Sequence, residues 1–185
     1  GSTGVDLNQL FINTAFAYKL NEKTQLGLAP IVAVQSFEAK GLGSFAAFSQ
    51  NAANLSDKGH DTVFGYGVRV GIRQKLNDVF LMGASYQSTI NFEAFEKYSG
   101  LFAEGGDMDI PSTYNLGVAY DDGQITLALD YQKINYSETP SVANSLMPNL
   151  MSSPLGSANG AGFGWNDMEV FKLGGAYQQG NGNVV

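Results

Sequence analysis

Residues 62–93 constrain the fold most, because they contain two long runs of period-two alternation that meet at Asn77-Asp78. Such alternation is typical of β-strands. In the first run the apolar face carries Phe64, Tyr66, Val68, Val70 and Ile72, and the opposite face carries Gly65, Gly67, Arg69, Gly71 and Arg73. In the second run the apolar face carries Phe80, Met82, Ala84, Tyr86, Ile90 and Phe92. The segment therefore predicts a long antiparallel hairpin with one apolar face.

Each arm of this hairpin is more than twice as long as an average strand of about 5–6 residues. Crossing a hydrocarbon layer of roughly 30 Å at a tilt near 45° takes about 13 residues of strand. The arms are long enough for this, and their glycine-rich face suits a barrel wall whose inner side meets water or a ligand. A long hairpin in a soluble sheet is the alternative interpretation.

Composition excludes several classes of protein. The chain has 185 residues, a net charge of −7 and no basic run, which argues against nucleic acid as a partner. It has no cysteine, so disulfides, thiolate metal sites and a thiol nucleophile are excluded. A transmembrane helix would need about 18 consecutive apolar residues, which the sequence lacks, whereas alternating strands give weak hydropathy and leave a membrane barrel open.

Short and long connections alternate along the whole chain. Seven strands are expected at about residues 8–20, 24–38, 62–76, 79–93, 110–120, 124–136 and 167–178. Long loops follow every second strand, at residues 39–61, 94–109 and 137–166. Outer-membrane barrels have short turns at one end and long loops at the other. The sequence thus predicts a single all-β segment, an antiparallel up-and-down meander that forms part of a larger transmembrane β-barrel.

Two further local features fit this architecture. Aromatic residues that predict a girdle at each end of the wall are Tyr18, Phe80 and Tyr120 near short turns, and Phe37, Phe92, Tyr136 and Trp165 near long loops. Pro30 has no N–H to donate to a neighbouring strand, so a bulge or a break in pairing is expected beside it.

Three segments in this order resemble the FadL/TodX-type family of outer-membrane transporters for long-chain fatty acids and other hydrophobic compounds. They are FAYKLNEKTQLGLAP at residues 16–30, DIPSTYNLGVAYDDGQITLALDYQKINYS at residues 109–137 and LGSANGAGFGWNDMEVFKLGGAYQ at residues 155–178. The resemblance implies a fourteen-stranded barrel in the bacterial outer membrane, of which these strands would be a central fragment. It also implies that the family's N-terminal hatch and its C-terminal closing strands are absent here.

The same resemblance implies passive uptake of hydrophobic small molecules such as long-chain fatty acids. Capture at the outer loops would be followed by passage through the lumen and lateral release through the wall. The family's capture groove would fall on the loops at 39–61 and 94–109. Candidate ligand-binding residues there are Phe45, Phe48, Tyr98, Leu101 and Phe102. A small core that belongs to the loops themselves is an equal interpretation of these five residues.

Charged residues on the inner face form a second candidate set. Arg69, Arg73, Asp130 and Lys172 are predicted to face the lumen, where pairing among themselves is the first interpretation and contact with a ligand carboxylate or with solvent is the second. An open sheet is also expected, because seven strands in a simple meander would bring the first and last strands together in parallel. Its edges would then need further strands, lipid or detergent.

Catalytic and metal-binding constellations are not found. The single histidine, His60, lies in a polar loop and is expected to be solvated. Glu104, Asp107 and Asp109 have the oxygens that calcium prefers, but their spacing around Gly105-Gly106 fits no ordered ligand loop, so solvated acids are expected. No cofactor, metal or enzymatic activity is predicted. A soluble ligand-binding β-barrel or sandwich and a structural outer-membrane barrel or adhesin stay open as alternative functions.

Overall fold

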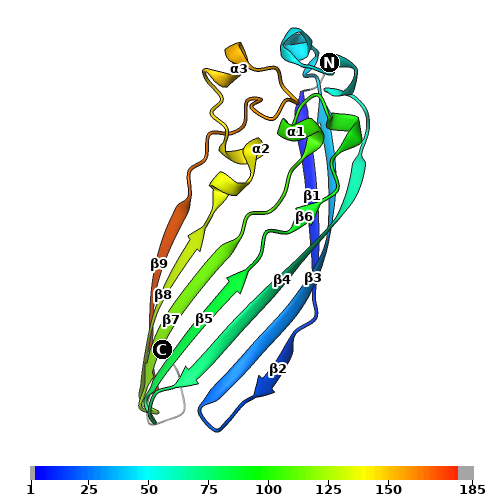
Figure 1. Ribbon diagram of the computed structural model, residues 1–185. Coiled ribbons are helices and arrows are strands. Elements are labelled where there is room, and N and C mark those ends of the chain that lie inside the picture. The colour runs from blue at the N-terminus through cyan, green and yellow to red at the C-terminus, as the bar shows by residue number, and fades with distance from the viewer. Residues whose placement is uncertain (1–2, 179–185) are drawn as a thin grey trace.

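The computed structural model describes residues 3–178, which form one curved antiparallel sheet with three long loops gathered at one end (Figure 1). The strand order is β1-β3-β4-β5-β7-β8-β9, so each wall strand pairs with its neighbours in sequence. No helix within residues 3–178 is long and apolar enough to cross a membrane. The predicted all-β meander is confirmed.

Nine strand segments make up the seven wall strands, because β1 with β2 and β5 with β6 are interrupted single strands. The segments are β1 (Gly4–Asn13), β2 (Phe16–Lys19), β3 (Thr24–Lys40), β4 (Asp61–Lys75), β5 (Phe80–Gln87), β6 (Asn91–Phe92), β7 (Thr113–Asp121), β8 (Ile125–Ile134) and β9 (Met168–Tyr177). The loops contain the 3₁₀ turns η1 (Gly43–Phe48), η2 (Ala52–Asn54), η3 (Glu96–Tyr98) and η4 (Tyr136–Glu138), and the one-turn helices α1 (Ala103–Gly106), α2 (Pro140–Ala143) and α3 (Asn149–Ser152).

The first interruption lies beside Pro30 of β3. β1 ends at Asn13 and β2 begins at Phe16, and between them the Thr14 N–H donates to the Pro30 carbonyl at 3.3 Å. Proline has no N–H to complete the ladder at this point. The register is the same on both sides. The interruption is therefore the expected break in pairing, and it moves neither strand relative to the other.

The second interruption, between β5 and β6, does change the register. Arg69 of β4 pairs with Gln87, whereas Gly65 pairs with Phe92, so four steps along β4 correspond to five along β5 and β6. One extra residue of this kind is a β-bulge, and it moves every side chain beyond it to the other face of the sheet. Ile90 and Phe92 therefore point to the inner face.

The prediction that Ile90 and Phe92 share the outer face with Phe80 and Met82 is wrong for this reason. Ile90 is only 1% exposed and packs against Ile31 of β3, with Phe92 beside it. The glycines opposite leave the necessary room. A Cβ at Gly65 would lie 2.6 Å from the Phe92 ring, and a Cβ at Gly67 would lie 2.9 Å from Ile90.

The main core lies between the inner face of β3–β4 and the loop at 94–109, not between two sheets. The Phe37 ring packs against Tyr98 and Phe102 with centroid distances of 4.9 and 4.8 Å. Val63 and Phe95 complete this buried cluster. The opposite face of the sheet is apolar and uncovered, and Leu173 on it is 83% exposed. A soluble sandwich would bury that face under a second sheet, whereas the described residues form a single sheet.

Candidate functional site

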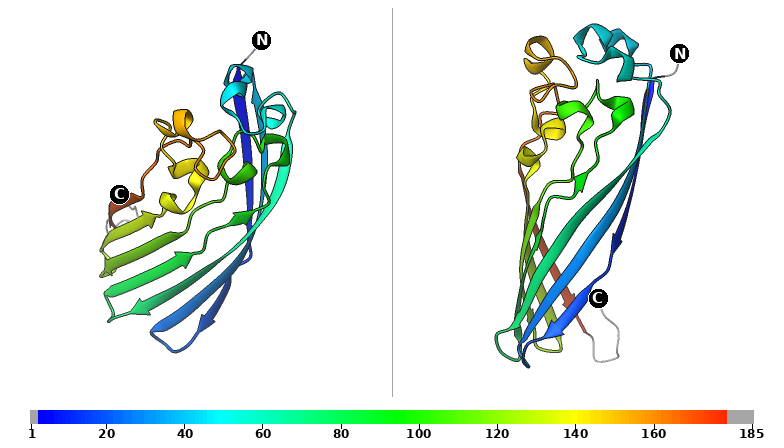
Figure 2. Two further views of the ribbon diagram at one scale, coloured as in Figure 1. Left: turned by 45° about the horizontal axis from the view of Figure 1, so that its top comes forward. Right: turned by 45° about the vertical axis from the view of Figure 1, so that its right-hand side comes forward.

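The three long loops are joined to one another over the inner side of the curved sheet (Figure 2). Ser49 Oγ donates to the Gly100 carbonyl at 2.7 Å, which ties the first loop to the second. The Gln50 N–H donates to the Leu155 carbonyl at 3.0 Å, which ties the first loop to the third. The loop at 137–166 thus packs together with the loops at 39–61 and 94–109, on which the family resemblance would place a capture groove.

Between these loops and the sheet lies an apolar cavity of about 530 Å³. Strands contribute Val5, Leu7 and Phe37; the first two loops contribute Leu42, Phe45, Leu55, Leu101, Phe102 and Met108; and the third loop contributes Ser141, Leu146, Leu150, Leu155, Ala161, Gly162 and Phe163. Ser141 is the one lining side chain with a polar group among the described residues. Ligand pockets are typically about 300–1,000 Å³ and mainly apolar, so the cavity has the size and character of a site for a small hydrophobic molecule.

The five candidate ligand-binding residues divide between this cavity and the core. Phe45, Leu101 and Phe102 line the cavity. Tyr98 is fully buried in the core cluster, and its hydroxyl donates to the Gly59 carbonyl at 2.8 Å. Phe48 lies outside the lining and is 38% exposed. The loops thus build a small core, which takes up Tyr98, and one surface of this core forms a side of the cavity. Ligand binding by Phe45, Leu101 and Phe102 stays a prediction.

Sequence reasoning missed the third loop and the start of the first strand as parts of this cavity. The signal in the loop was the set of apolar residues Leu146, Leu150 and Phe163 within a stretch rich in Ser, Asn and Gly. Val5 and Leu7 lie before residue 8, where the first strand was expected to begin. In the structure β1 already includes them, and their side chains point to the inner face. The sequence does not show that these residues share a site, because they lie far apart along the chain and meet only in the folded structure.

Electrostatics around the cavity disfavour a bound anion. Met108 of the lining lies between Asp107 and Asp109, and burial, followed by the charge of Asp109, raises the pKa of Asp107 to about 6. Burial also raises the pKa of Asp109. Within the described chain no lining residue carries a positive charge. A ligand carboxylate would therefore find acids and no cation beside it.

Asp107 and Asp109 differ from the solvated acids that the sequence predicted, because each is only partly exposed. Glu104 and Gly105 have positive φ angles of 54° and 77°, and this left-handed turn folds the following residues back against the sheet. His60 is also partnered, with Nε2 3.0 Å from Asp6 Oδ2. In residues 3–178 no group of three or more His, Cys, Asp or Glu side chains is arranged to hold a metal ion.

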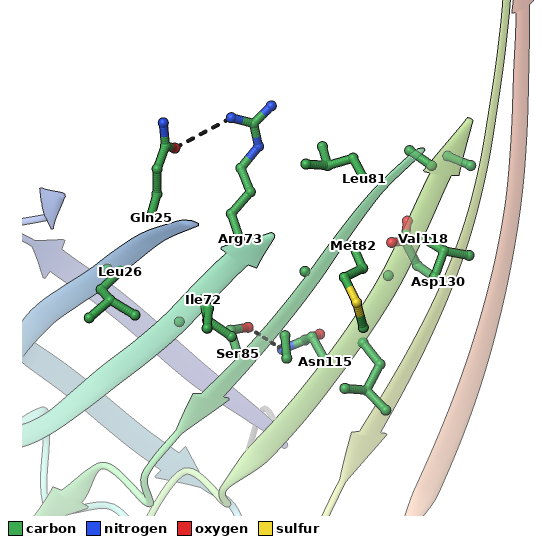
Figure 3. Close-up of a pocket in the computed structure, with 18 of the residues that line it drawn as sticks. Gln25, Leu26, Ile72, Arg73, Leu81, Met82, Ser85, Asn115, Val118 and Asp130 are labelled. Carbon is green, nitrogen blue, oxygen red and sulfur yellow. Dashed lines mark hydrogen bonds between the residues drawn. The ribbon is translucent and has the colours of Figure 1, made fainter. Parts of the chain in front are cut away.

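A second hollow of about 500 Å³ runs along the inner face below the loops (Figure 3). Directly paired residues of neighbouring strands form a row across this hollow. The two central residues of the row are glycines, so no side chain fills the hollow there. The row is Gln25, Arg73, Gly83, Gly117, Asp130 and Lys172. Ser85 and Asn115 lie in the next row and are joined by a hydrogen bond of 3.3 Å. The lining of this trough combines these polar side chains with glycine, alanine and aliphatic residues. Polar side chains and glycines on the inner face are expected for the lumen side of a barrel wall.

The four charged candidates lie on this inner face but do not pair with one another. Arg73 and Asp130 line the trough, whereas Arg69 and Lys172 lie outside its lining. Arg69 donates to Gln87 at 2.5 Å, Arg73 to Gln25 at 3.3 Å and Lys172 to Gln132 at 3.4 Å. Among residues 3–178 none of the four forms an ion pair. Mutual pairing, the first interpretation of these charges, is therefore wrong.

The outer face carries aromatic pairs toward both ends of its apolar band. Near the short turns Phe80 packs on Tyr120 with ring centroids 5.2 Å apart. Toward the loops the pairs are Tyr86 with Tyr114 at 4.8 Å and Tyr131 with Phe171 at 5.1 Å. Phe37 and Phe92, which were expected in the upper girdle, point inward instead. Tyrosine side chains near the ends of the apolar band suit a membrane interface, because the ring is apolar and the hydroxyl can be hydrated.

A curved, open wall of amphipathic strands, with short turns at one end and long loops at the other, defines a segment of a transmembrane β-barrel. The sequence matches the family model for outer membrane protein transport protein (OMPP1/FadL/TodX) over residues 2–182. The chain belongs to this family, and its place is the bacterial outer membrane.

Solved structures of similar fold include two toluene transporters. TbuX of Ralstonia pickettii superposes with a TM-score of 0.62 at 16% sequence identity, covering 96% of this chain and 53% of that one. TodX of Pseudomonas putida superposes with a TM-score of 0.61 at 15% identity, covering 96% of this chain and 52% of that one. This chain thus spans about half the length of these relatives. No curated protein matches it in sequence.

Proposed function

We propose that this chain is part of a passive channel, not an enzyme, that admits hydrophobic small molecules through the outer membrane. The cavity of about 530 Å³ beneath the three loops carries this proposal, because it places an apolar site at the end of a lumen-facing wall. Family membership and the toluene named for TbuX and TodX agree with such a cargo.

Capture would begin at the exposed apolar residues around the cavity. Leu146 and Phe163 line it and are 56% and 61% exposed, so a ligand reaches apolar surface before it is enclosed. Burial of apolar surface is favourable by roughly 25 cal/mol per Å². The molecule would then pass to the trough, where polar and charged side chains such as Arg73 and Asp130 interrupt the apolar lining, so that it is held more weakly and can leave.

Uncharged molecules fit the cavity better than long-chain fatty acids do. A fatty-acid tail would be accommodated, but its carboxylate would lie beside Asp107 and Asp109 or would have to stay in water. Burying a charge without a partner costs more than the tail regains in a small cavity. Among the described residues, Arg73 is the cation that lines the trough. We therefore place neutral hydrocarbons first and fatty acids second among the proposed substrates.

Lateral release through the wall is the proposed last step. The ladder between β5 and β7 is interrupted from the pair Gln87–Thr113 to the pair Ile90–Ile110. In that gap the Ser112 N–H donates to the Glu138 carboxylate at 3.0 Å in place of a strand partner. A seam closed by one side chain is weaker than a continuous ladder, which supports an exit at this height of the wall.

The cavity is tested by placing a charge in it. Phe45→Asp and Leu101→Asp should each weaken binding of the uncharged probe N-phenyl-1-naphthylamine by about tenfold or more, since each removes apolar contact worth about 1.5–3 kcal/mol when complete. Affinity is measured by fluorescence titration in detergent micelles, with toluene as competitor. Phe48→Asp is the matched control, because this exposed phenylalanine on the same loop lies outside the lining.

Equal affinities for the parent chain, Phe45→Asp and Phe48→Asp would contradict the proposal. That result would leave a structural barrel as the better interpretation of the fold. Tighter binding of palmitate than of a neutral hydrocarbon of similar size would reverse the proposed order of substrates but keep the channel.

A further inference from the structure

Residues 107–109 form a junction at which three parts of the molecule meet. Their carbonyls accept, in order, hydrogen bonds from Ser141 Oγ, Gln35 Nε2 and Thr139 Oγ1, the last two at 3.2 and 3.3 Å. These donors come from β3 and from the third loop, and all three are at most 3% exposed. Three buried donors that all reach the backbone of one tripeptide fix its position closely.

The same tripeptide carries two carboxyl groups in a place that poorly tolerates charge. Asp109 Oδ1 accepts the Phe92 N–H at 2.6 Å. Asp107 Oδ1 is buried without a hydrogen-bond partner in the described chain, and so is Gln35 Oε1. An unpartnered carboxylate oxygen is costly when it is charged and buried. A proton held between the two acids lowers this cost, because it removes one charge and supplies a donor.

This junction forms one wall of the cavity. Met108, between the two acids, lines the cavity, and so does Ser141, which holds the junction from the third loop. Met108 also packs against the core cluster that includes Phe102. Movement of residues 107–109 away from the sheet would therefore open the cavity on this side.

We propose that Asp107 and Asp109 form a proton-dependent latch on this wall. With one proton shared between the carboxyls, residues 107–109 stay docked on β3 and on the third loop; loss of that proton to solvent leaves two adjacent negative charges and loosens the docking. Glu104 on the same loop adds its negative charge to the field at Asp109. The elements packed against the pair contribute the neutral groups Gln35, Phe92 N–H, Thr139 and Ser141. The consequence for ligand binding rests on the proposed function of the cavity.

The direction of the pH dependence follows from the pKa of Asp107, which burial and Asp109 raise from 3.8 to about 6. When residues 107–109 have moved away from the sheet, Asp107 loses its proton above its ordinary pKa of 3.8. In the docked form Asp107 retains the proton until about pH 6. The contribution of the latch is thus complete below about pH 4 and is lost as the pH rises through about 6. Acid conditions should tighten the cavity wall and neutral conditions should loosen it.

Amide hydrogen exchange of the full chain in detergent micelles tests the latch directly. At about pH 7.5, Asp107→Asn should protect the Phe92 amide and the 106–110 segment about tenfold better than the wild type does. A pKa displaced by two units corresponds to about 100-fold, and we reduce this because the acids are partly exposed. At about pH 3.5, below the ordinary pKa of 3.8 that applies to the opened form, the two proteins should agree. Glu96→Gln, which neutralises an exposed acid on the same loop, is the matched control and should behave as the wild type.

Equal protection of wild type and Asp107→Asn at both pH values would overturn the latch. If Asp107→Asn does not fold, Asp109→Asn takes its place, because it removes the same repulsion and keeps an acceptor for Phe92. Titration with N-phenyl-1-naphthylamine at the two pH values separates latch from function. Exchange that follows the expected pattern while the probe binds at neither pH would retain the latch and contradict the cavity's proposed role.

Discussion

At the scale of single residues, the inner face depends on positions where no side chain is tolerated. Gly65 and Gly67 lie beneath Phe92 and Ile90, which the bulge in the neighbouring strand turns inward. From the sequence, these glycines were expected to belong to a wall whose inner side meets water or a ligand. In the structure they are the floor on which an apolar cluster rests, so their role is packing beneath the loops.

Replacing Gly65 with valine should destabilise the protein by about 1–3 kcal/mol, because a Cβ there would overlap the Phe92 ring and overpacking carries a cost of this size. The free energy of unfolding by urea in micelles measures it. Gly174→Val is the matched control, since a Cβ at this inner-face position of β9 meets nothing within 4 Å. Phe92→Ala should largely rescue Gly65→Val. Equal costs at the two glycines would contradict this packing role.

At the scale of elements, strands could be predicted from the sequence because they depend on local alternation. Strand register and contacts between distant loops could not be predicted in this way. β3 and β4 were predictable because apolar residues alternate through most of these strands of 17 and 15 residues. The bulge was not, because Tyr86, Ile90 and Phe92 all stand at even positions although the backbone changes face between Gln87 and Phe92. Phe45 and Leu101 were recognised as apolar loop residues, but the third loop joins them through contacts that no local pattern encodes.

The assignment of faces is tested by an arginine on either side of β7. Val118→Arg places a charge on the outer, lipid-facing side and should cost about 2–4 kcal/mol near the middle of the bilayer. Ala119→Arg, its neighbour in the same strand, points to the lumen and should cost well under half as much. Unfolding free energies in lipid vesicles give the comparison. A larger cost for Ala119→Arg would exchange the two faces and contradict the register.

At the scale of the whole molecule, the sheet is open and apolar on its outer side. Within residues 3–178 the edge formed by β1 and β2 is not paired with β9. Open edges and a bare apolar face are unstable in hydrocarbon or water unless further strands cover the edges and lipid covers the face. The curvature brings the loops over the inner side, which gives the cavity its position at the end of the lumen.

Photolabelling with an uncharged aromatic diazirine, in the presence and absence of toluene, tests most directly the claim that small hydrophobic molecules enter the loop cavity. The reagent should label the outer face through the lipid and, separately, the cavity residues Leu101, Phe102 and Leu150. Excess toluene should abolish labelling in the cavity and leave labelling of outer residues such as Leu116 and Leu173 unchanged. Labelling confined to the outer face, or cavity labelling that toluene does not reduce, would contradict the account.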